Sequence, residues 1–175
     1  MPEATARIDT VLEPSFANGL EELPVEEVRR RRDEALAERE FQSYLRRLLQ
    51  ARQDLLVAER ERRVTGEPAA PLVERITAAL SEGPAHSPGR GEAFRNVLSD
   101  EDLDEANRRA DEVLQLGTSD PTALSDEGLA GALAGISGAE RTVSKARAAV
   151  IRVHDRLQDE LKRRYREDPS LIPQA

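Results

Sequence analysis

The sequence predicts an all-α protein in which two long helices form an antiparallel coiled coil, with a shorter intervening helix and flexible linkers. Only two Tyr and three Phe occur in the 175 residues, and there is no Trp. So few aromatic and β-branched residues disfavour a compact β or α/β core, whereas the excess of Ala, Leu, Glu and Arg is typical of long helices. Two long stretches also repeat their apolar residues at steps of three and four, the period of a coiled-coil face.

The charge and the missing residue types exclude several classes of protein. The 34 acidic and 26 basic residues give a net charge of −8. This acidity argues against direct binding to DNA and favours a basic protein surface as the partner. Without Cys there is no disulfide, thiolate metal site or Cys nucleophile, and the isolated His86 and His154 are a poor metal set. We therefore predict no metal.

Neither an enzyme nor a membrane protein is expected. No phosphate-binding loop and no nucleophile motif is recognisable, and a thin helical hairpin has little room for a pocket that excludes water. The apolar runs are only a few residues long, so no segment is expected to cross a membrane. The N-terminal residues lack the basic and apolar regions of a signal peptide, and we expect a cytoplasmic protein.

The chain is expected to begin with a flexible segment and a long helix. Residues 1–24 contain Pro14, Gly19 and Pro24 without a sustained period, which predicts a flexible N-terminal segment. Residues 25–65 contain no Gly or Pro, and a helix of this length is about 60 Å long. Its apolar face is formed by Phe41, Leu45, Leu48 and Leu55, flanked by Leu49, Ala51 and Leu56.

Charged runs on this first long helix are interpreted as solvated surface. The four arginines at 29–32 have acidic residues on both sides and are expected to pair with them. Glu38, Glu40 and Glu59 are interpreted as salt-bridged residues on an exposed, Arg-rich helix.

A linker and a short acidic helix are predicted next. Residues 66–98 are rich in Gly and Pro and predict a linker, within which 72–80 have the composition of a short helix. Residues 99–117 predict an acidic amphipathic helix with Ser99 as its N-cap and a stop at Gly117. We expect this helix to offer a second contact to a partner.

Residues 118–166 predict the second long helix, whose regular part starts near Ser125, and 167–175 predict a flexible tail. The steps of its apolar stripe alternate between four and three, which is the heptad signature. The stripe consists of Ala132, Ile136, Ala139, Val143, Ala146, Val150, Val153, Leu157 and Leu161.

Two structural alternatives remain open. The first concerns four glycines near this stripe, which either permit close approach of another backbone or merely weaken the first turns. They are Gly128, Gly131, Gly135 and Gly138. The second concerns the two stripes, which could be buried in an intramolecular hairpin or in a homodimer.

The two long helices share a polar pattern with offsets 0, 4, 7, 11 and 15. At about 100° per residue these positions fall within an arc of about 80°, rotated away from the apolar stripe. The alternative interpretation is a solvated face held by i,i+4 pairs. The first copy is Arg39, Ser43, Arg46, Gln50 and Asp54, and the second is Glu140, Ser144, Arg147, Ile151 and Asp155.

Such a stripe has the chemistry to bind a nucleotide. An Asp carboxylate can accept from two adjacent N–H donors, as on the Watson–Crick edge of guanine, and an Arg fork suits guanine O6 and N7 or a phosphate. The Arg and the Asp of each copy lie about 12 Å apart along the helix. This spacing suits a ligand with two bases and phosphates between them.

The segments 43–60 and 124–161 resemble RsiG, an actinobacterial anti-sigma-factor family also labelled aerial mycelium formation proteins. The family motif is Glu, three residues, Ser, two residues, Arg, three residues, Gln, three residues and Asp, once on each helix of an antiparallel coiled coil. Two residues depart from it, because Arg39 stands in the place of Glu and Ile151 in the place of Gln. The matching residues are Ser43, Arg46, Gln50, Asp54, Glu140, Ser144, Arg147 and Asp155.

The resemblance implies an anti-sigma factor that uses cyclic di-GMP as a regulatory ligand. Two ligand molecules would lie against the polar stripe and bridge the protein to a sigma factor of the flagellar or sporulation type. Arg46 and Arg147 would contact guanine or phosphate, Asp54 and Asp155 would accept from guanine, and the other matching residues would complete the hydrogen bonds. We expect a hairpin monomer rather than a homodimer in the sigma-bound state.

Two other functions remain as alternatives. The first is a structural coiled-coil adaptor without a nucleotide ligand, in which the polar stripes are merely solvated. The second is a cyclic di-GMP sensor with a different protein partner. The departures at Arg39 and Ile151 bear on the affinity and stoichiometry of the ligand, since one reverses a charge and the other removes an amide.

Overall fold

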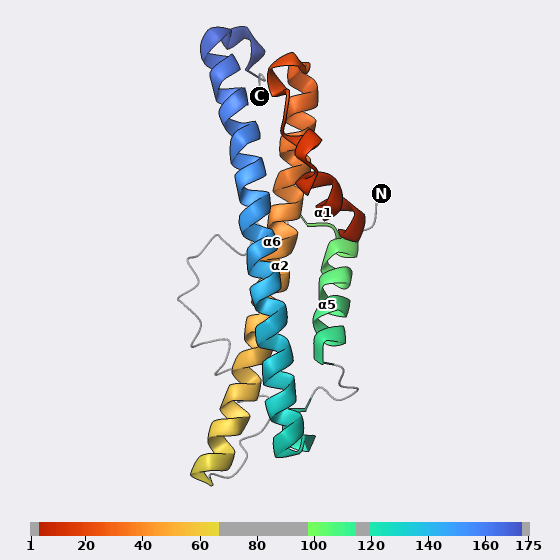
Figure 1. Ribbon diagram of the computed structural model, residues 1–175, viewed down its shortest axis with the longest axis vertical. Coiled ribbons are helices and arrows are strands. Elements are labelled where there is room, and N and C mark those ends of the chain that lie inside the picture. Colours follow the sequence, from red (N-terminus) through yellow and green to blue (C-terminus); the bar gives the residue numbers. More distant parts are fainter. Residues whose placement is uncertain (1–3, 67–97, 115–119, 173–175) are drawn as a thin grey trace. The chain divides into compact units, whose positions relative to one another are not determined.

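The computed structural model describes residues 4–66, 98–114 and 120–172, and within these ranges all regular structure is helical (Figure 1). The predicted all-α class is confirmed. The long helices α2 (Val25–Thr65) and α6 (Asp126–Glu167) pack against each other, and the shorter α5 (Asp100–Leu114) lies between them in the sequence. The predicted short helix at 72–80 and most of the linker lie outside the described residues.

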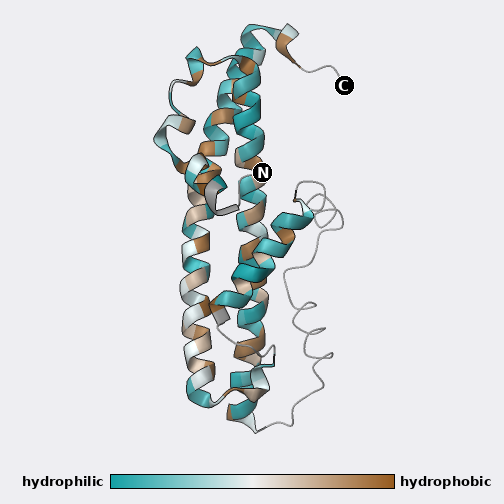
Figure 2. Ribbon diagram, turned by 90° about the vertical axis from the view of Figure 1, so that its right-hand side faces the viewer, coloured by the Kyte–Doolittle hydropathy of each residue, from teal (hydrophilic) through white to brown (hydrophobic). Residues whose placement is uncertain are grey.

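The chain divides into two compact units, and both long helices contribute to each of them. Unit 1 combines Met1–Gln42 with Lys145–Ala175, and unit 2 is Ser43–Ser144. Each unit therefore pairs one end of α2 with the opposite end of α6, as expected of an antiparallel hairpin within one chain. Figure 2 shows hydrophobic and hydrophilic residues interspersed along both long helices.

The described part of the N-terminal segment, residues 4–24, forms helical elements in unit 1, which differs from the flexible segment predicted for 1–24. It forms α1 (Ala4–Leu12) and two 3-10 helices, η1 (Pro14–Phe16) and η2 (Leu20–Glu22). These elements bury Val11, Phe16 and Leu20 in one cluster with side chains of both long helices. Elements this short bury one or two side chains each, so they produce no sustained period. The partners from the long helices are Val28, Ala35, Val150, Leu157 and Leu161.

The tail also departs from the prediction, since α6 is followed by the 3-10 helix η4 (Pro169–Leu171). The side chain of Asp168 caps η4 by accepting from the backbone N–H of Ser170 at 3.0 Å. Arg29 on α2 donates to the carbonyl of Leu171, which ties the tail to α2 within unit 1.

Helix α1 is held by a buried ion pair. Arg7 donates through Nε to Glu38 Oε2 at 2.7 Å, Gln42 donates to Glu38 Oε1 at 2.8 Å, and the Arg7 guanidinium lies 5.6 Å from the Phe41 ring centroid. Glu38 is fully buried, which corrects its interpretation as an exposed surface residue. A buried carboxylate is tolerated only when it is paired and hydrogen-bonded, and Arg7 and Gln42 meet that condition.

The core of unit 2 brings α5 against both long helices. Leu56 of α2 and Leu129, Ala132 and Ile136 of α6 form a buried cluster, and Val113 of α5 packs on it. The predicted N-cap of α5 is confirmed, because the Ser99 hydroxyl accepts from the backbone N–H of Asp102 at 3.1 Å. This helix begins at Asp100, and its described part ends at Leu114, before the predicted stop.

Helix α6 begins at Asp126, later than the predicted boundary at 118 and next to Ser125, where its regular part was expected. The η3 turn (Pro121–Ala123) precedes it, and Ser125 Oγ accepts from the backbone N–H of Gly128 at 3.1 Å. No residue of the predicted apolar stripe is exposed. Of the apolar face predicted on α2, Phe41, Leu45, Leu49 and Leu56 are buried, whereas Leu48 and Leu55 are half-buried.

The glycines of α6 do not mark a close approach of backbones. A Cβ at Gly131 would have no heavy atom within 4 Å, and one at Gly135 would meet the Val113 carbonyl of α5 at an ordinary 3.7 Å. The glycines therefore fit the alternative in which they only weaken the first turns of the helix.

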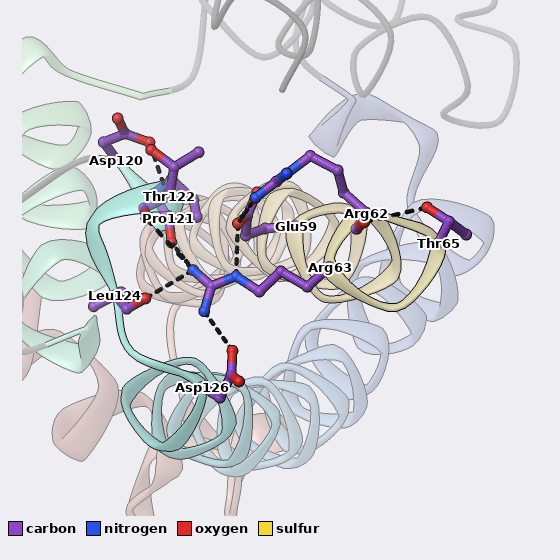
Figure 3. Close-up of polar contacts among 9 residues, drawn as sticks. All are labelled: Glu59, Arg62, Arg63, Thr65, Asp120, Pro121, Thr122, Leu124 and Asp126. Atoms are coloured by element: carbon purple, nitrogen blue, oxygen red, sulfur yellow. Dashed lines mark hydrogen bonds and ion pairs between the residues drawn. The ribbon is translucent and has the colours of Figure 1, made fainter. Parts of the chain in front are cut away.

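A Glu-x-x-Arg-Arg pattern on the long helices holds the short segments that precede them in the sequence, through hydrogen bonds to backbone carbonyls. In unit 2, Glu59 orients Arg62 and Arg63, and Arg63 also donates to the carbonyl of Leu124 at 2.7 Å and to Asp126 at 2.7 Å (Figure 3). Glu59 is fully buried and Arg62 holds its pKa at about 2, with a further contribution from Arg63. Glu59 is therefore salt-bridged as predicted, but it is buried and not on an exposed surface.

The same device occurs twice in unit 1. Glu160 pairs with Arg163 and Arg164, and Arg164 donates to the carbonyls of Leu20 and Leu23. Glu27 likewise pairs with Arg30 and Arg31, and Arg31 donates to the carbonyls of Ser15 and Phe16. The arginines at 29–32 are thus paired with acidic residues as expected. In addition, Arg29 binds the carbonyl of Leu171 in the C-terminal tail, and Arg31 binds the carbonyls of η1.

Candidate functional site

The ten positions of the two motif copies, called here the motif face, are divided between the two units. The first and last parts of each copy therefore lie in different units. Unit 2 holds Ser43, Arg46, Gln50, Asp54, Glu140 and Ser144, and unit 1 holds Arg39, Arg147, Ile151 and Asp155.

In unit 2 the two copies meet at Glu140. Arg46 Nε donates to Glu140 Oε1 at 2.7 Å and to Ser144 Oγ at 2.9 Å, and Ser144 donates to Glu140 at 3.0 Å. Gln50 Nε2 completes the network with a longer contact of 3.5 Å to Glu140 Oε1. The side chains of α2 and α6 thus bond across the two helices, and not only to neighbours on their own helix.

This network changes the expected position of the polar stripe. The side chains of Arg46 and Glu140 are 39% and 19% exposed, so they lie in a half-buried seam between the helices. The sequence predicted a face rotated away from the apolar stripe. Long polar side chains can reach back to the edge of a helix contact from such positions, which is why the periodicity alone placed them too far outside.

Charge and hydrogen bonding favour an ionised Glu140. The Arg46 guanidinium lowers the pKa of the Glu140 carboxyl below its usual value, against the effect of burial, and the Ser144 hydroxyl lowers it further. Within the described part of the chain, every hydrogen bond of Arg46 runs through Nε. Its Nη1 and Nη2 groups therefore take no part in those contacts.

Two further residues extend this seam and were missed in the sequence. Gln53 Nε2 on α2 donates to Ser137 Oγ on α6 at 3.2 Å. Gln53 lies seven residues after Arg46, and Ser137 lies seven before Ser144. A heptad step forward on one helix and backward on the other is the signal that predicts this pair.

The acidic ends of the two copies are open to solvent. Asp54 is exposed, and no hydrogen bond or ion pair joins it to the rest of the described chain. Asp155 is 63% exposed, with its Oδ1 atom 3.4 Å from Nδ1 of the largely buried His154. Both carboxylates could accept from a ligand without first breaking an internal ion pair with arginine.

In unit 1 the first motif position has a different arrangement. Arg39 donates through Nε and Nη2 to Glu40 Oε1 at 2.9 and 2.7 Å, on its own helix. Arg147 and Ile151 on α6 are half-buried. The contact of Arg39 with Glu40 on its own helix thus differs from the contacts of Glu140 in unit 2, which join two helices.

The described residues were also examined for a metal site, a pocket and a membrane-spanning helix. None of them form a group of three or more His, Asp or Glu side chains that could hold a metal. A pocket of about 380 Å³ in unit 1 is lined by Gly19, Leu20, Arg156 and Arg163, among others, and contains no motif residue. No helix in the ranges that the structure covers is both long and apolar enough to cross a membrane.

Each unit is thus built on an antiparallel pair of helix segments, and in unit 2 polar side chains of the two motif copies join these helices along a half-buried seam. Residues 14–80 match the model of the RsiG-like family, which confirms the predicted resemblance for the segment that carries the first motif copy. This match spans η1, η2, α2 and the first copy. No curated protein matches the chain.

Proposed function

We propose that this protein is an anti-sigma factor that binds cyclic di-GMP at its motif face and, with the ligand as a bridge, sequesters a sigma factor of the flagellar or sporulation type. The observation that carries the proposal is the network in which Arg46 and Gln50 of α2 meet Glu140 and Ser144 of α6. The RsiG-like match supports the regulatory class.

The network pre-organises Arg46 for a ligand. Because Nε is held by Glu140 and Ser144, the planar guanidinium has a restrained orientation, while its Nη groups make no hydrogen bond to another described residue. A restrained fork loses less conformational entropy on binding a guanine edge or a phosphate. Asp54 lies about 12 Å further along α2 and supplies an exposed carboxylate for guanine N–H groups.

A bridging ligand is also compatible with the acidic charge of this chain. Cyclic di-GMP brings two phosphates, which an acidic chain can bind only where arginine side chains are placed for them. A ligand with one side on the motif face and the other on the sigma factor adds contact area to both proteins. Affinity for the sigma factor then rises with the ligand, and ligand affinity rises with the sigma factor by the same factor.

Isothermal titration with cyclic di-GMP, with and without the sigma factor, tests the proposal. We expect ligand binding that tightens when the sigma factor is present. Arg46→Ala should weaken ternary assembly by about tenfold or more, the typical loss for a hydrogen bond to a charged group. Arg60→Ala is the matched control, since Arg60 is an exposed arginine on the same helix outside the motif.

Each result of the titration separates the candidate functions. Ligand binding that is unaffected by the sigma factor would support a sensor with a different partner. If no heat is measured with or without the sigma factor, cyclic di-GMP is not a ligand, and the structural adaptor is the supported function. An equal loss in Arg46→Ala and Arg60→Ala would show that the motif face is not the binding site.

A further inference from the structure

Helix α6 has a row of basic side chains on its outer face within unit 1. Lys145, Arg152 and Arg156, called here the basic row, are exposed. Their spacing of seven and four residues places them within an arc of about 40°. Val150 and Leu157 of the buried core lie about 120–140° around the helix from the centre of this arc. The basic row therefore lies on the side of α6 that faces away from the core of unit 1.

The charge of this row is opposite to that of the whole chain, which has a net charge of −8. Residues 145–156 include four basic residues and one acidic residue. No hydrogen bond or ion pair joins Lys145 or Arg152 to the rest of the described chain, and Arg156 Nη2 makes one contact of 3.2 Å, to Asn18 Oδ1. The positive charge of this surface is therefore available to a partner.

Helix α5 has the opposite charge, since its 15 residues include seven acidic and two basic ones. The buried Ala106 and Ala110 show which side of α5 faces inward. Asp100, Asp104 and Asp111, called here the acidic row, are exposed and also lie within an arc of about 40°. This arc is about 100–140° around the helix from the two alanines, so the acidic row faces outward.

The two rows have the same spacing in opposite directions. The acidic row continues from Asp100 at offsets of 4 and 11, and the basic row has the same offsets when counted backward from Arg156. Both rows are therefore about 16 Å long. In an antiparallel contact between them, each carboxylate would face one cation. The three pairs are Asp100 with Arg156, Asp104 with Arg152, and Asp111 with Lys145.

The carboxylates of the acidic row remain open to a second molecule. No side-chain hydrogen bond or ion pair joins Asp100 or Asp104 to another described residue. Asp111 Oδ1 accepts from Arg52 on α2, which helps to hold α5 in unit 2. The Asp111 side chain is nevertheless 70% exposed, and its Oδ2 atom takes no part in that ion pair.

We propose that the acidic row on α5 of one copy docks antiparallel on the basic row on α6 of a second copy, so that the protein associates with itself. Every copy has both rows, so the contact can form in both directions. This inference goes beyond the proposed function, because it requires neither the nucleotide nor the sigma factor. Each copy keeps its own hairpin, so the contact differs from a homodimer that shares the apolar stripes.

The self-association should be weak and sensitive to salt. An exposed ion pair contributes little by itself, and one helix face buries less than a standard interface of about 1,600 Å². Complementary charges on the two rows speed up the encounter and select the register. The screening length falls from about 10 Å at 0.1 M salt to about 3 Å at 1 M, so high salt should separate the copies.

Sedimentation equilibrium of the full chain without ligand tests the self-association. At low ionic strength the mean mass should rise above that of one chain as the protein concentration is increased. In about 1 M salt it should return to the mass of one chain. A protein that stays monomeric at low ionic strength, or that associates equally well in high salt, would overturn the proposal.

A charge swap tests the register. Arg152→Glu and Asp104→Lys should each weaken self-association by about threefold or more, because each turns an attractive pair into a repulsive one. An equimolar mixture of the two variants should restore the association. In the mixture, one contact has exchanged charges and the other has the native pair. If the mixture associates no better than either variant alone, the register is wrong.

Matched controls separate this contact from the effect of net charge. Arg60→Glu and Glu61→Lys make the same changes of charge at exposed positions on α2, outside both rows. These variants should associate like the wild type, alone and mixed. Weakening equal to that of the row variants would overturn the proposal. Because Asp104 and Arg152 are exposed, we expect the row variants to keep the helicity of the wild type in circular dichroism.

Discussion

At the residue scale, arginine side chains join distant parts of the chain through ion pairs and hydrogen bonds to backbone carbonyls. Arg63 is the clearest case, because one guanidinium contacts Glu59, Asp126 and the carbonyl of Leu124 (Figure 3). Five donors in one plane let it satisfy two carboxylates and a turn at once. Arg46 uses the same property at the motif face, where Nε is anchored by Glu140.

Arg63→Lys should destabilise the protein although it keeps the charge. A lysine has a single charged nitrogen and cannot reach both carboxylates and the carbonyls that precede α6. The loss of these charged hydrogen bonds should lower the melting temperature by about 4–8 °C. Thermal unfolding of Arg63→Lys beside Arg60→Lys measures this loss, and equal curves would contradict the clamp.

At the element scale, each long helix is specified by its own residues, while the short elements depend on contacts with them. Helix α1 is tied to α2 by the buried pair of Arg7 and Glu38. The η2 turn is held by Arg164, and the segment before α6 is held by Arg63. The long helices thus serve as the platform on which the rest of each unit is assembled.

Gly131→Ala should stabilise α6. Gly131 is helical and exposed, and a Cβ there would meet no heavy atom within 4 Å. Replacing a mid-helix glycine by alanine contributes about 1 kcal/mol, or about 2–4 °C in melting temperature. Gly66→Ala is the matched control with the opposite sign, because Gly66 ends α2 at a φ of 71° that strains alanine. A lower melting temperature for Gly131→Ala would contradict the open surroundings of this glycine.

At the scale of the whole molecule, both units depend on carboxylates that remain ionised in acid. Arg30 lowers the pKa of Glu27 to about 2, Arg62 does so for Glu59, and Arg163 does so for Glu160. An unfolded carboxyl titrates near 4.5, so the unfolded chain binds more protons between the two values. The stability that these groups contribute is complete above about 4.5 and is lost as the pH falls towards 2.

Thermal unfolding as a function of pH tests this contribution. The wild-type melting temperature should fall steeply between pH 4.5 and about 2. A variant with Glu27, Glu59 and Glu160 changed to Gln should melt lower at neutral pH and show a flatter acid limb, whereas Glu61→Gln at an exposed position should follow the wild type. An acid limb in the triple variant that is as steep as that of the wild type would contradict the assignment.

The sequence alone specified the helical class, the bounds of α2, the Ser99 cap and the repeated motif positions. Each of these depends on residues within a few turns of one another, so helical periodicity and capping chemistry were sufficient to predict them. The register signal was also present, in the heptad steps that relate Arg46 to Gln53 and Ser144 to Ser137. This signal predicts the facing residues of the two helices only when one facing pair is already known.

Only the tertiary structure decided which polar groups are buried and what they hold. Arg63 reaches a carbonyl 58 residues further along the chain, and Arg164 reaches one 144 residues away. Every residue has a backbone carbonyl, so nothing in the residue types indicates which ones will be acceptors. Burial of Glu38 and order in the N-terminal segment likewise follow from α1 docking on the long helices, which bring Arg7 and Val11 to their partners.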